Sequence, residues 1–163
     1  MSSLTLDIAV ESPAWSAQDT DWDTCLRRVA QTTLIHAGFG EKTVELSLVL
    51  ADDSFIQNLN KTYRGKDAPT NVLSFPQFEP HELQGLTGEI PLGDIILAYG
   101  TLQKEATEQG KSFEHHAVHL TVHGLLHLLG HDHETETEAE MMEQLEIQIL
   151  RTLGIKNPYA PPA

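Results

Sequence analysis

The chain has few of the features that direct a protein out of the cytoplasm. Its 163 residues include a single cysteine, Cys25, which has no partner for an internal disulfide and lies in an apolar helical pattern that favours packing over reactivity. The most apolar stretch, residues 117–129, is interrupted by histidines and is too short to span a bilayer. The first residues contain neither a basic segment nor an apolar core, so we expect no secretory signal. We therefore predict a cytoplasmic protein without a membrane partner.

Basic residues are also scarce. Lysine and arginine together number 10 against 24 aspartates and glutamates, which gives a formal net charge of -14 and an isoelectric point near 4.8. Such a charge repels polyanions at long range, which argues against nucleic acid unless the few cations gather at one site, and no DNA partner is expected. The length fits a single domain over residues 1–163, with a Pro-rich tail at 156–163 that we expect to be flexible.

Strand-like and helix-like hydrophobic patterns are mixed along the chain. Apolar and polar residues alternate at 4–10 and 44–50, and further strands are expected at 71–75 and 92–99. Helical spacing predicts helices at 19–37, from 52 or 53 to about 63, from 101 to a break at 110, at 112–129 and at 136–153, while 77–87 is expected to be a mobile loop. This order favours an α+β fold in which one sheet packs on helices and the helix at 112–129 is buried against it.

What the chain does contain is a group of histidines around a glycine, in the segment His123-Gly-Leu-Leu-His127-Leu-Leu-Gly-His-Asp-His133. Two histidines four residues apart lie on one face of a helix, close enough to bind one ion. Gly130 can leave the helix in a left-handed conformation, so that the chain turns back and presents His133 to the same ion. Three protein ligands leave a fourth position open, as in catalytic zinc sites, so we predict one Zn²⁺ ion per chain. The alternative is that these histidines merely lie on a buried or solvated helix face.

The spacing of the three histidines is similar to that of the metzincin proteases, HExxHxxGxxH, but Gly124 replaces their glutamate. That glutamate takes the proton from the metal-bound water, so a peptidase without it would need another base. The site therefore indicates metal-assisted hydrolysis of some other bond. Within the same segment, His131 is a candidate substrate-binding or supporting group, or else a surface histidine. Asp132 is a candidate to orient a ligand imidazole or to cap the turn.

A second group of polar residues lies upstream, at residues 58–76. It holds three of the ten basic residues, Lys61, Arg64 and Lys66, just before an expected strand. A planar guanidinium can clamp a phosphate through two parallel hydrogen bonds, which favours Arg64 as a phosphate-binding group. The alternative is a surface arginine paired with Asp67.

With these residues, the chain resembles the YbeY family of bacterial ribosomal RNA maturation factors, which are metal-dependent endoribonucleases. The resemblance rests on three blocks, at 60–76, at 88–95 and at 123–133. It implies an α+β fold with a mixed sheet and a zincin-like metal helix, zinc ligands at His123, His127 and His133, and a functional Arg64 facing the metal cleft. It further implies a substrate of single-stranded or ribosomal RNA, action at the 3′ end of the small-subunit RNA and in ribosome quality control, and the ribosome or ribosomal proteins as partners.

The chain departs from the family at Asn71, where members usually carry aspartate. Asparagine keeps the shape and one acceptor but loses the charge, which leaves a supporting or turn role for this position. Lys61, Lys66 and His131 are the further candidates for substrate binding, and Asp132 joins Asn71 as a candidate supporting residue. Our hypothesis is a zinc-dependent endoribonuclease. The alternatives are a zincin-like metallopeptidase and a non-enzymatic ribosome assembly factor with structural zinc.

Overall fold

The computed structural model describes residues 3–83, 85–132 and 134–159. In chain order its elements are β1 (Ser3–Val10), α1 (Trp22–His36), β2 (Thr43–Ala51), α2 (Asp53–Arg64), β3 (Val72–Pro76), α3 (Pro80–Leu83), β4 (Glu89–Ala98), α4 (Tyr99–Gln109), α5 (Phe113–Leu128) and α6 (Glu136–Thr152). Within these described ranges, no helix combines the length and apolar character that crossing a bilayer requires.

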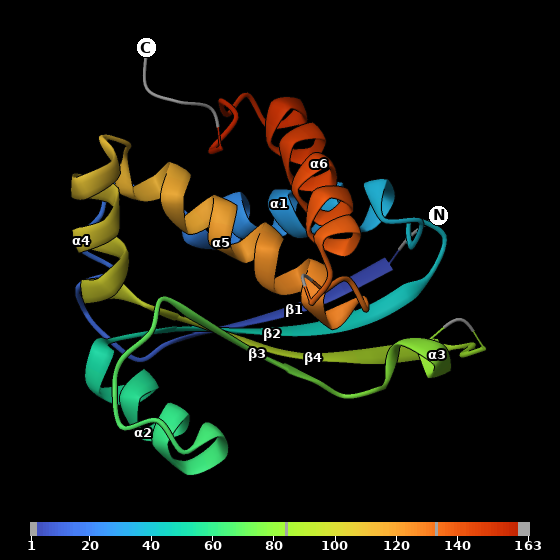
Figure 1. Cartoon of the computed structure of the whole chain (residues 1–163), viewed down its shortest axis with the longest axis horizontal. Coiled ribbons are helices and arrows are strands. Elements are labelled where there is room, and N and C mark those ends of the chain that lie inside the picture. Colours follow the sequence, from blue (N-terminus) through green and yellow to red (C-terminus); the bar gives the residue numbers. More distant parts are fainter. Residues whose placement is uncertain (1–2, 84, 133, 160–163) are drawn as a thin grey trace.

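The four strands form one mixed sheet in the order β1-β2-β4-β3. β1 and β2 pair in parallel, as do β2 and β4, whereas β3 runs antiparallel to β4 and lies at the edge of the sheet. Helices α1, α5 and α6 lie on one side of the sheet and α2 lies on the other (Figure 1). The predicted α+β fold with a mixed sheet is therefore confirmed.

The helices begin where side chains can cap them. The carboxylate of Asp21 accepts the backbone N–H of Thr24 at the start of α1, and that of Asp52 accepts the N–H of Phe55 at the start of α2. The hydroxyl of Ser112 caps α5 in the same way. Each such cap satisfies a backbone donor that the first turn of a helix leaves without a partner. These short-range signals explain why the predicted helix starts lie within a few residues of the observed ones.

Two sequence predictions need correction. The expected loop at 77–87 contains the short helix α3, because Pro80 suits a first helical turn, Glu82 accepts the backbone N–H of Glu79, and Leu83 is buried in the core. β4 begins at Glu89, three residues earlier than expected, because 89–91 pair with β2 ahead of a register shift. Pro80 and Gly85 indicated irregular structure at 77–87, but burial of Leu83 favours a helical turn there, and pairing with β2 extends β4.

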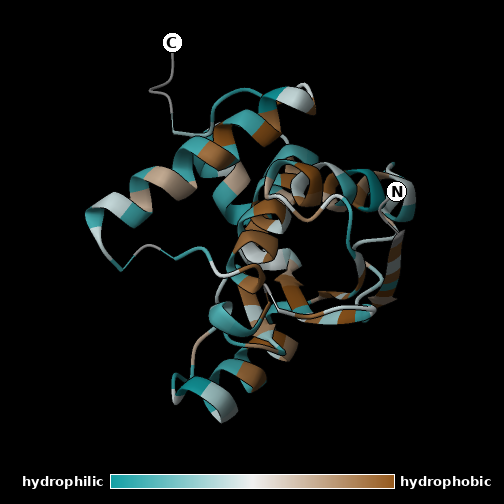
Figure 2. Ribbon diagram, turned by 90° about the vertical axis from the view of Figure 1, so that its right-hand side faces the viewer, coloured by the Kyte–Doolittle hydropathy of each residue, from teal (hydrophilic) through white to brown (hydrophobic). Residues whose placement is uncertain are grey.

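Helix α5 is buried around most of its circumference, as predicted. Leu125 and Leu128 belong to a core cluster shared with the sheet, whereas Val122 and Leu126 pack with α1 and α6. Figure 2 shows the hydrophobic residues gathered where the helices meet the sheet and the hydrophilic residues on the outer helices. Cys25 is half-buried against the second cluster, and burial raises the pKa of its thiol to about 11, which agrees with a packing role.

Replacing Gly93 should disrupt the edge of the sheet that carries β3. Gly93 has a φ of +135°, and a Cβ there would collide with the carbonyl oxygen of Phe75. We expect Gly93→Ala to lower the free energy of unfolding by more than about 3 kcal/mol, because backbone strain adds to displacement of β3. Gly38→Ala is the matched control, since Gly38 also has a positive φ but no atom within 4 Å of an added Cβ. It should cost only about 1–2 kcal/mol in urea denaturation, and equal losses for the two variants would contradict this account.

Candidate active site

A cleft of about 810 Å³ lies along the edge strand β3. It is lined by the C-terminal end of α2, by β3 and the segment after it, and by the end of α5 with the turn that follows. Among the residues that it brings together are Arg64, Asn71, His123, His127, His131 and Asp132. The cleft thus joins the two groups of polar residues that are far apart in the sequence.

The first two predicted metal ligands converge within this cleft. His123 and His127 lie one turn apart on α5, and their Nε2 atoms are 3.1 Å apart. Imidazole nitrogens are good ligands for zinc, and two of them at this separation can bind one ion. The donor set that α5 presents therefore fits a zinc ion.

A buried carboxylate on α6 holds the first of these histidines in place. Glu146 is only 1% exposed and accepts hydrogen bonds from His123 Nδ1 at 3.1 Å, from His119 Nε2 at 3.0 Å and from the Tyr159 hydroxyl at 2.9 Å. Burial by itself would raise the pKa of Glu146, but the hydrogen bonds from the two histidines outweigh it and lower the pKa to about 2. Because the Nδ1 of His123 donates to an ionised carboxylate, the bond selects the tautomer of the neutral imidazole in which Nε2 carries the lone pair that a metal requires.

The turn after α5 has the geometry predicted for it. Gly130 has a φ of +100°, and a Cβ at this position would lie 2.9 Å from Pro80 Cβ, so only glycine fits here without strain. His133, the third predicted ligand, lies outside the described residues. Within 3–83, 85–132 and 134–159, no three histidine, cysteine or acidic side chains form a group that could hold a metal ion. The three-histidine zinc site therefore stays a prediction, supported by His123 and His127.

Arg64 lines the cleft from the C-terminal end of α2. The alternative role for this residue was an ion pair with Asp67, but the carboxylate of Asp67 lies 4.0 Å from Lys61 Nζ and also accepts from Gln57. Neither Lys61 nor Lys66 is among the described residues that line the cleft, and both are exposed. Contact of Lys61 and Lys66 with the substrate therefore stays a prediction.

Asn71 lines the cleft but is held from outside it. Its side-chain amide donates to both carboxylate oxygens of Glu105, at 3.1 and 3.3 Å, and Glu105 also bonds to His116 at 2.9 Å. An aspartate at position 71 would place a second carboxylate against Glu105, so the amide suits this environment. His131 and Asp132 both line the cleft, and burial lowers the pKa of His131, which favours its neutral form.

Gly124, which stands where the metzincins carry their glutamate, faces the sheet. A Cβ on Gly124 would lie 3.0 Å from Ile95 Cγ2 and 3.0 Å from Ser74 Oγ, and the Ser74 hydroxyl donates to the Gly124 carbonyl at 3.2 Å. Helix α5 therefore packs too closely on β3 and β4 here to accommodate a long side chain. No general base can come from this position.

Comparisons with known proteins agree with this architecture. A family model described as Endoribonuclease YbeY matches residues 7–154. The chain belongs to this family. It is 47% identical over 154 residues to the Endoribonuclease YbeY of Rhodopseudomonas palustris, covering 94% of this chain and 80% of that protein. It is also 47% identical over 161 residues to the Endoribonuclease YbeY of Chelativorans sp., covering 97% and 94% of the two chains.

A solved structure supports the fold. The solution structure of TM1509 from Thermotoga maritima matches with a TM-score of 0.57 and 22% sequence identity, covering 92% of each chain. At this identity the likeness shows the fold alone. The resemblance of the sequence to the YbeY family, and the fold that it implied, are both confirmed.

Sequence reasoning missed Glu146 and its partners His119 and Tyr159. A signal for Glu146 was present, because it lies four residues after Met142 and three before Ile149 on the inward face of α6. A carboxylate at such a position must find hydrogen-bond donors to remain ionised. Its partners were not predictable, because α6 follows α5 through a turn whose direction the pattern does not determine.

Glu146→Gln should weaken zinc binding by this YbeY-family chain. The neutral amide loses the charge that strengthens both histidine bonds to Oε1, and its NH₂ group replaces the oxygen that accepts from Tyr159, so the orientation and tautomer of His123 are held less firmly. We expect the Kd for zinc to rise about 10- to 100-fold in competition with a chromogenic chelator. Glu140→Gln, an exposed substitution on the same helix, is the matched control and should leave the Kd unchanged. A Glu146→Gln protein that folds and binds zinc as tightly as the original chain would refute a positioning role.

Proposed function

We propose that the chain is a zinc-dependent endoribonuclease that cleaves single-stranded RNA. The observation that carries the proposal is the shared cleft, which is lined by Arg64 from α2 and by His123 and His127 from α5. Family membership supports RNA as the substrate, since the curated relatives are named endoribonucleases. The same resemblance supports a cytoplasmic role in ribosomal RNA maturation, at the 3′ end of the small-subunit RNA, and in ribosome quality control.

The ligands of the ion would be His123, His127 and His133. When bound, zinc would supply Lewis-acid polarisation of a phosphate oxygen and would make water easier to deprotonate. Glu146 would keep the Nε2 of His123 unprotonated and aimed at the ion. These roles need no acid or base from Gly124.

Arg64 would act on the phosphate itself. A guanidinium can donate two parallel hydrogen bonds to non-bridging oxygens and stabilise the negative charge that gathers there in the transition state. None of the carboxylates in the described part of the chain forms an ion pair with Arg64, so its donors can turn toward a substrate. Phosphate binding therefore fits the position of Arg64 better than the alternative of a surface ion pair with Asp67.

The net charge of -14 bears on how RNA would reach the cleft. Long-range repulsion slows association between an acidic protein and a polyanion. A partner that holds both molecules removes this difficulty, because the substrate is then delivered locally. We therefore include the ribosome or ribosomal proteins as partners in the proposal.

The two rival functions make different demands on the site. A zincin-like metallopeptidase needs a base near the ion, and Gly124 is packed against Ile95 and Ser74 where that base would be required. Casein cleavage that a chelator abolishes would revive this rival. A non-enzymatic assembly factor needs zinc only for stability, so a folded, metal-free ligand variant that complements normally would support it.

Arg64→Ala should lower the rate of cleavage of an unstructured RNA by about 10²- to 10³-fold, as expected for loss of one charge-stabilising group. Zinc content, measured in parallel, should stay unchanged because Arg64 is not a ligand. Arg64→Lys should recover only part of the rate, since an ammonium cannot form the bidentate contact. Arg27→Ala, which removes an arginine paired with Asp23 on α1, is the matched control and should cleave normally.

His127→Ala should lose both zinc and cleavage. Analysis of the RNA ends then identifies the attacking group, since a cyclic phosphate indicates the neighbouring ribose hydroxyl and a 5′-phosphate indicates water. The nuclease proposal fails if purified, zinc-loaded protein leaves unstructured RNA intact and His127→Ala behaves identically.

A further inference from the structure

Aromatic side chains gather at the α2 end of the cleft. Tyr63 and Phe75 line this end, and their rings meet edge-on with centroids 5.4 Å apart. Tyr63 is 68% exposed, so much of its side chain is accessible at the cleft. It directly precedes Arg64 in the chain. An exposed ring beside the candidate phosphate-binding residue requires an explanation.

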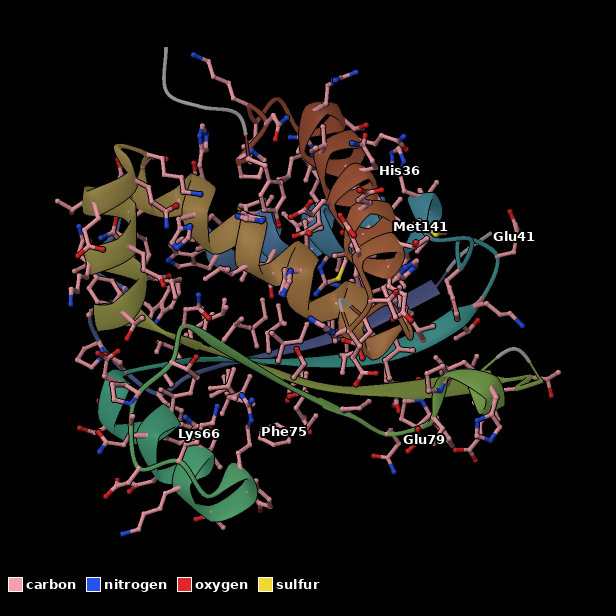
Figure 3. The ribbon with its side chains drawn as sticks, viewed as in Figure 1. His36, Glu41, Lys66, Phe75, Glu79 and Met141 are labelled. Carbon is pink, nitrogen blue, oxygen red and sulfur yellow. The ribbon has the colours of Figure 1, made fainter. Side chains whose placement is uncertain are left out.

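The cleft bends around the edge of β3. Side chains alternate along a strand, and Ser74 faces α5, where it bonds to Gly124. Phe75 therefore faces the opposite side, where it packs against a cluster that includes Ile56 of α2. Figure 3 shows Phe75 on the α2 side of the sheet. The histidine pair thus lies on one side of the edge strand and the aromatic rings lie on the other.

We propose that Tyr63, supported by Phe75, is a stacking platform for an unpaired base of the substrate. The inference deepens the proposed function and depends on it only for the identity of the ligand as RNA. A phosphate held by Arg64 would place the adjoining base over the neighbouring ring. Bases of a single strand can stack on aromatic side chains in this way, whereas bases inside a duplex already stack on one another. Tyr63 would therefore make the cleft selective for single strands.

The charges of the cleft favour stacking as the main source of affinity. Among its described lining residues, Arg64 is accompanied by two acidic side chains, Glu79 and Asp132. Without a bound metal ion, as in the chelator experiment below, attraction of phosphates to this surface is therefore weak, in agreement with the net charge of the chain. Stacking needs no net charge, so it can hold RNA where electrostatic steering fails.

The experiment uses Tyr63→Trp as a fluorescent reporter. The native tryptophans, Trp15 and Trp22, are 0% and 7% exposed, so RNA should quench mainly the emission of the introduced ring. The full chain is titrated with a single-stranded octamer of adenylate and with a hairpin that has a fully paired stem. A chelator is present to prevent cleavage. We expect quenching by the octamer and none by the paired stem.

Affinity is then measured for substitutions of Tyr63 itself, using a fluorescent label on the octamer. Tyr63→Ala should weaken binding about 5- to 100-fold, whereas Tyr63→Phe should bind like the original chain. Tyr63→Leu, which keeps apolar area without a ring face, should not restore binding. Ile35→Ala is the matched control, because Ile35 is 63% exposed on α1 and lies outside the cleft.

The salt dependence gives an independent readout. Each phosphate neutralised on a single strand contributes about -0.7 to the slope of log Kobs against log salt, so contact with Arg64 alone predicts a slope of about -0.7. A slope steeper than about -3 would overturn the stacking account. So would unchanged affinity of Tyr63→Ala, full recovery in Tyr63→Leu, or equal binding of the paired stem.

The same measurements separate this inference from the proposed function. Binding that depends on Tyr63 without cleavage in the presence of zinc would leave the platform standing and refute the nuclease. If the original chain cleaves RNA with zinc and its Tyr63→Ala variant binds RNA normally, the nuclease proposal stands and the stacking platform is refuted. If neither RNA binds the original chain, the platform is refuted, and the nuclease proposal is then decided by cleavage with zinc-loaded protein.

Discussion

The site depends on the close approach of α5 to the edge of the sheet. At Gly124 the helix backbone lies so close to Ile95 and Ser74 that an added Cβ would be 3.0 Å from each and would have to displace them, and the Ser74 hydroxyl bonds directly to the helix backbone. Because α5 lies this close to the sheet, His123 and His127 line the cleft at the edge of β3. The glycine that removes the protease-type glutamate is thus the residue that positions the histidines.

The rest of α5 is held by polar contacts that are unusual in a buried helix. His116 bonds to Glu105 of α4, and His119 bonds to Glu146 of α6, so α4 and α6 each supply one acid to this helix. A buried carboxylate is costly unless donors surround it, and Glu146 has three of them. Apolar packing places α5 between the sheet and the outer helices, and these pairs fix its rotation. A ligand-bearing helix needs such support, because a small rotation of α5 would turn His123 and His127 together away from the cleft.

Much of this arrangement follows from local sequence signals. Caps at Asp21, Asp52 and Ser112 and hydrophobic periodicity place the helices, and the spacing of two histidines places them on one helix face. The left-handed turn at Gly130 was predictable because the helical pattern ends there. All of these inferences concern residues within a few positions of one another.

The features that the sequence did not predict depend on contacts between segments that lie far apart in the chain. Arg64 shares a cleft with the histidines because β3 pairs with the outer edge of β4. Hydrophobic periodicity does not reveal the order of strands in a sheet. Glu146 was visible as an acid on an inward face, but its partners belong to another helix and to the end of the chain. α3 was missed because Pro80 and Gly85 indicated a loop, although burial of Leu83 favours a helical turn.

The bond between Tyr159 and Glu146 has a practical consequence for handling the protein. It ties the last described turn of the chain to the same carboxylate that orients His123. An affinity tag or fluorescent fusion joined after Tyr159 would strain the hydrogen bond between Tyr159 and Glu146. It would thereby disturb the alignment of the His123 imidazole. The amino-terminal strand β1 lies at the opposite margin of the sheet from β3, so it is the safer attachment point for purification or immobilisation.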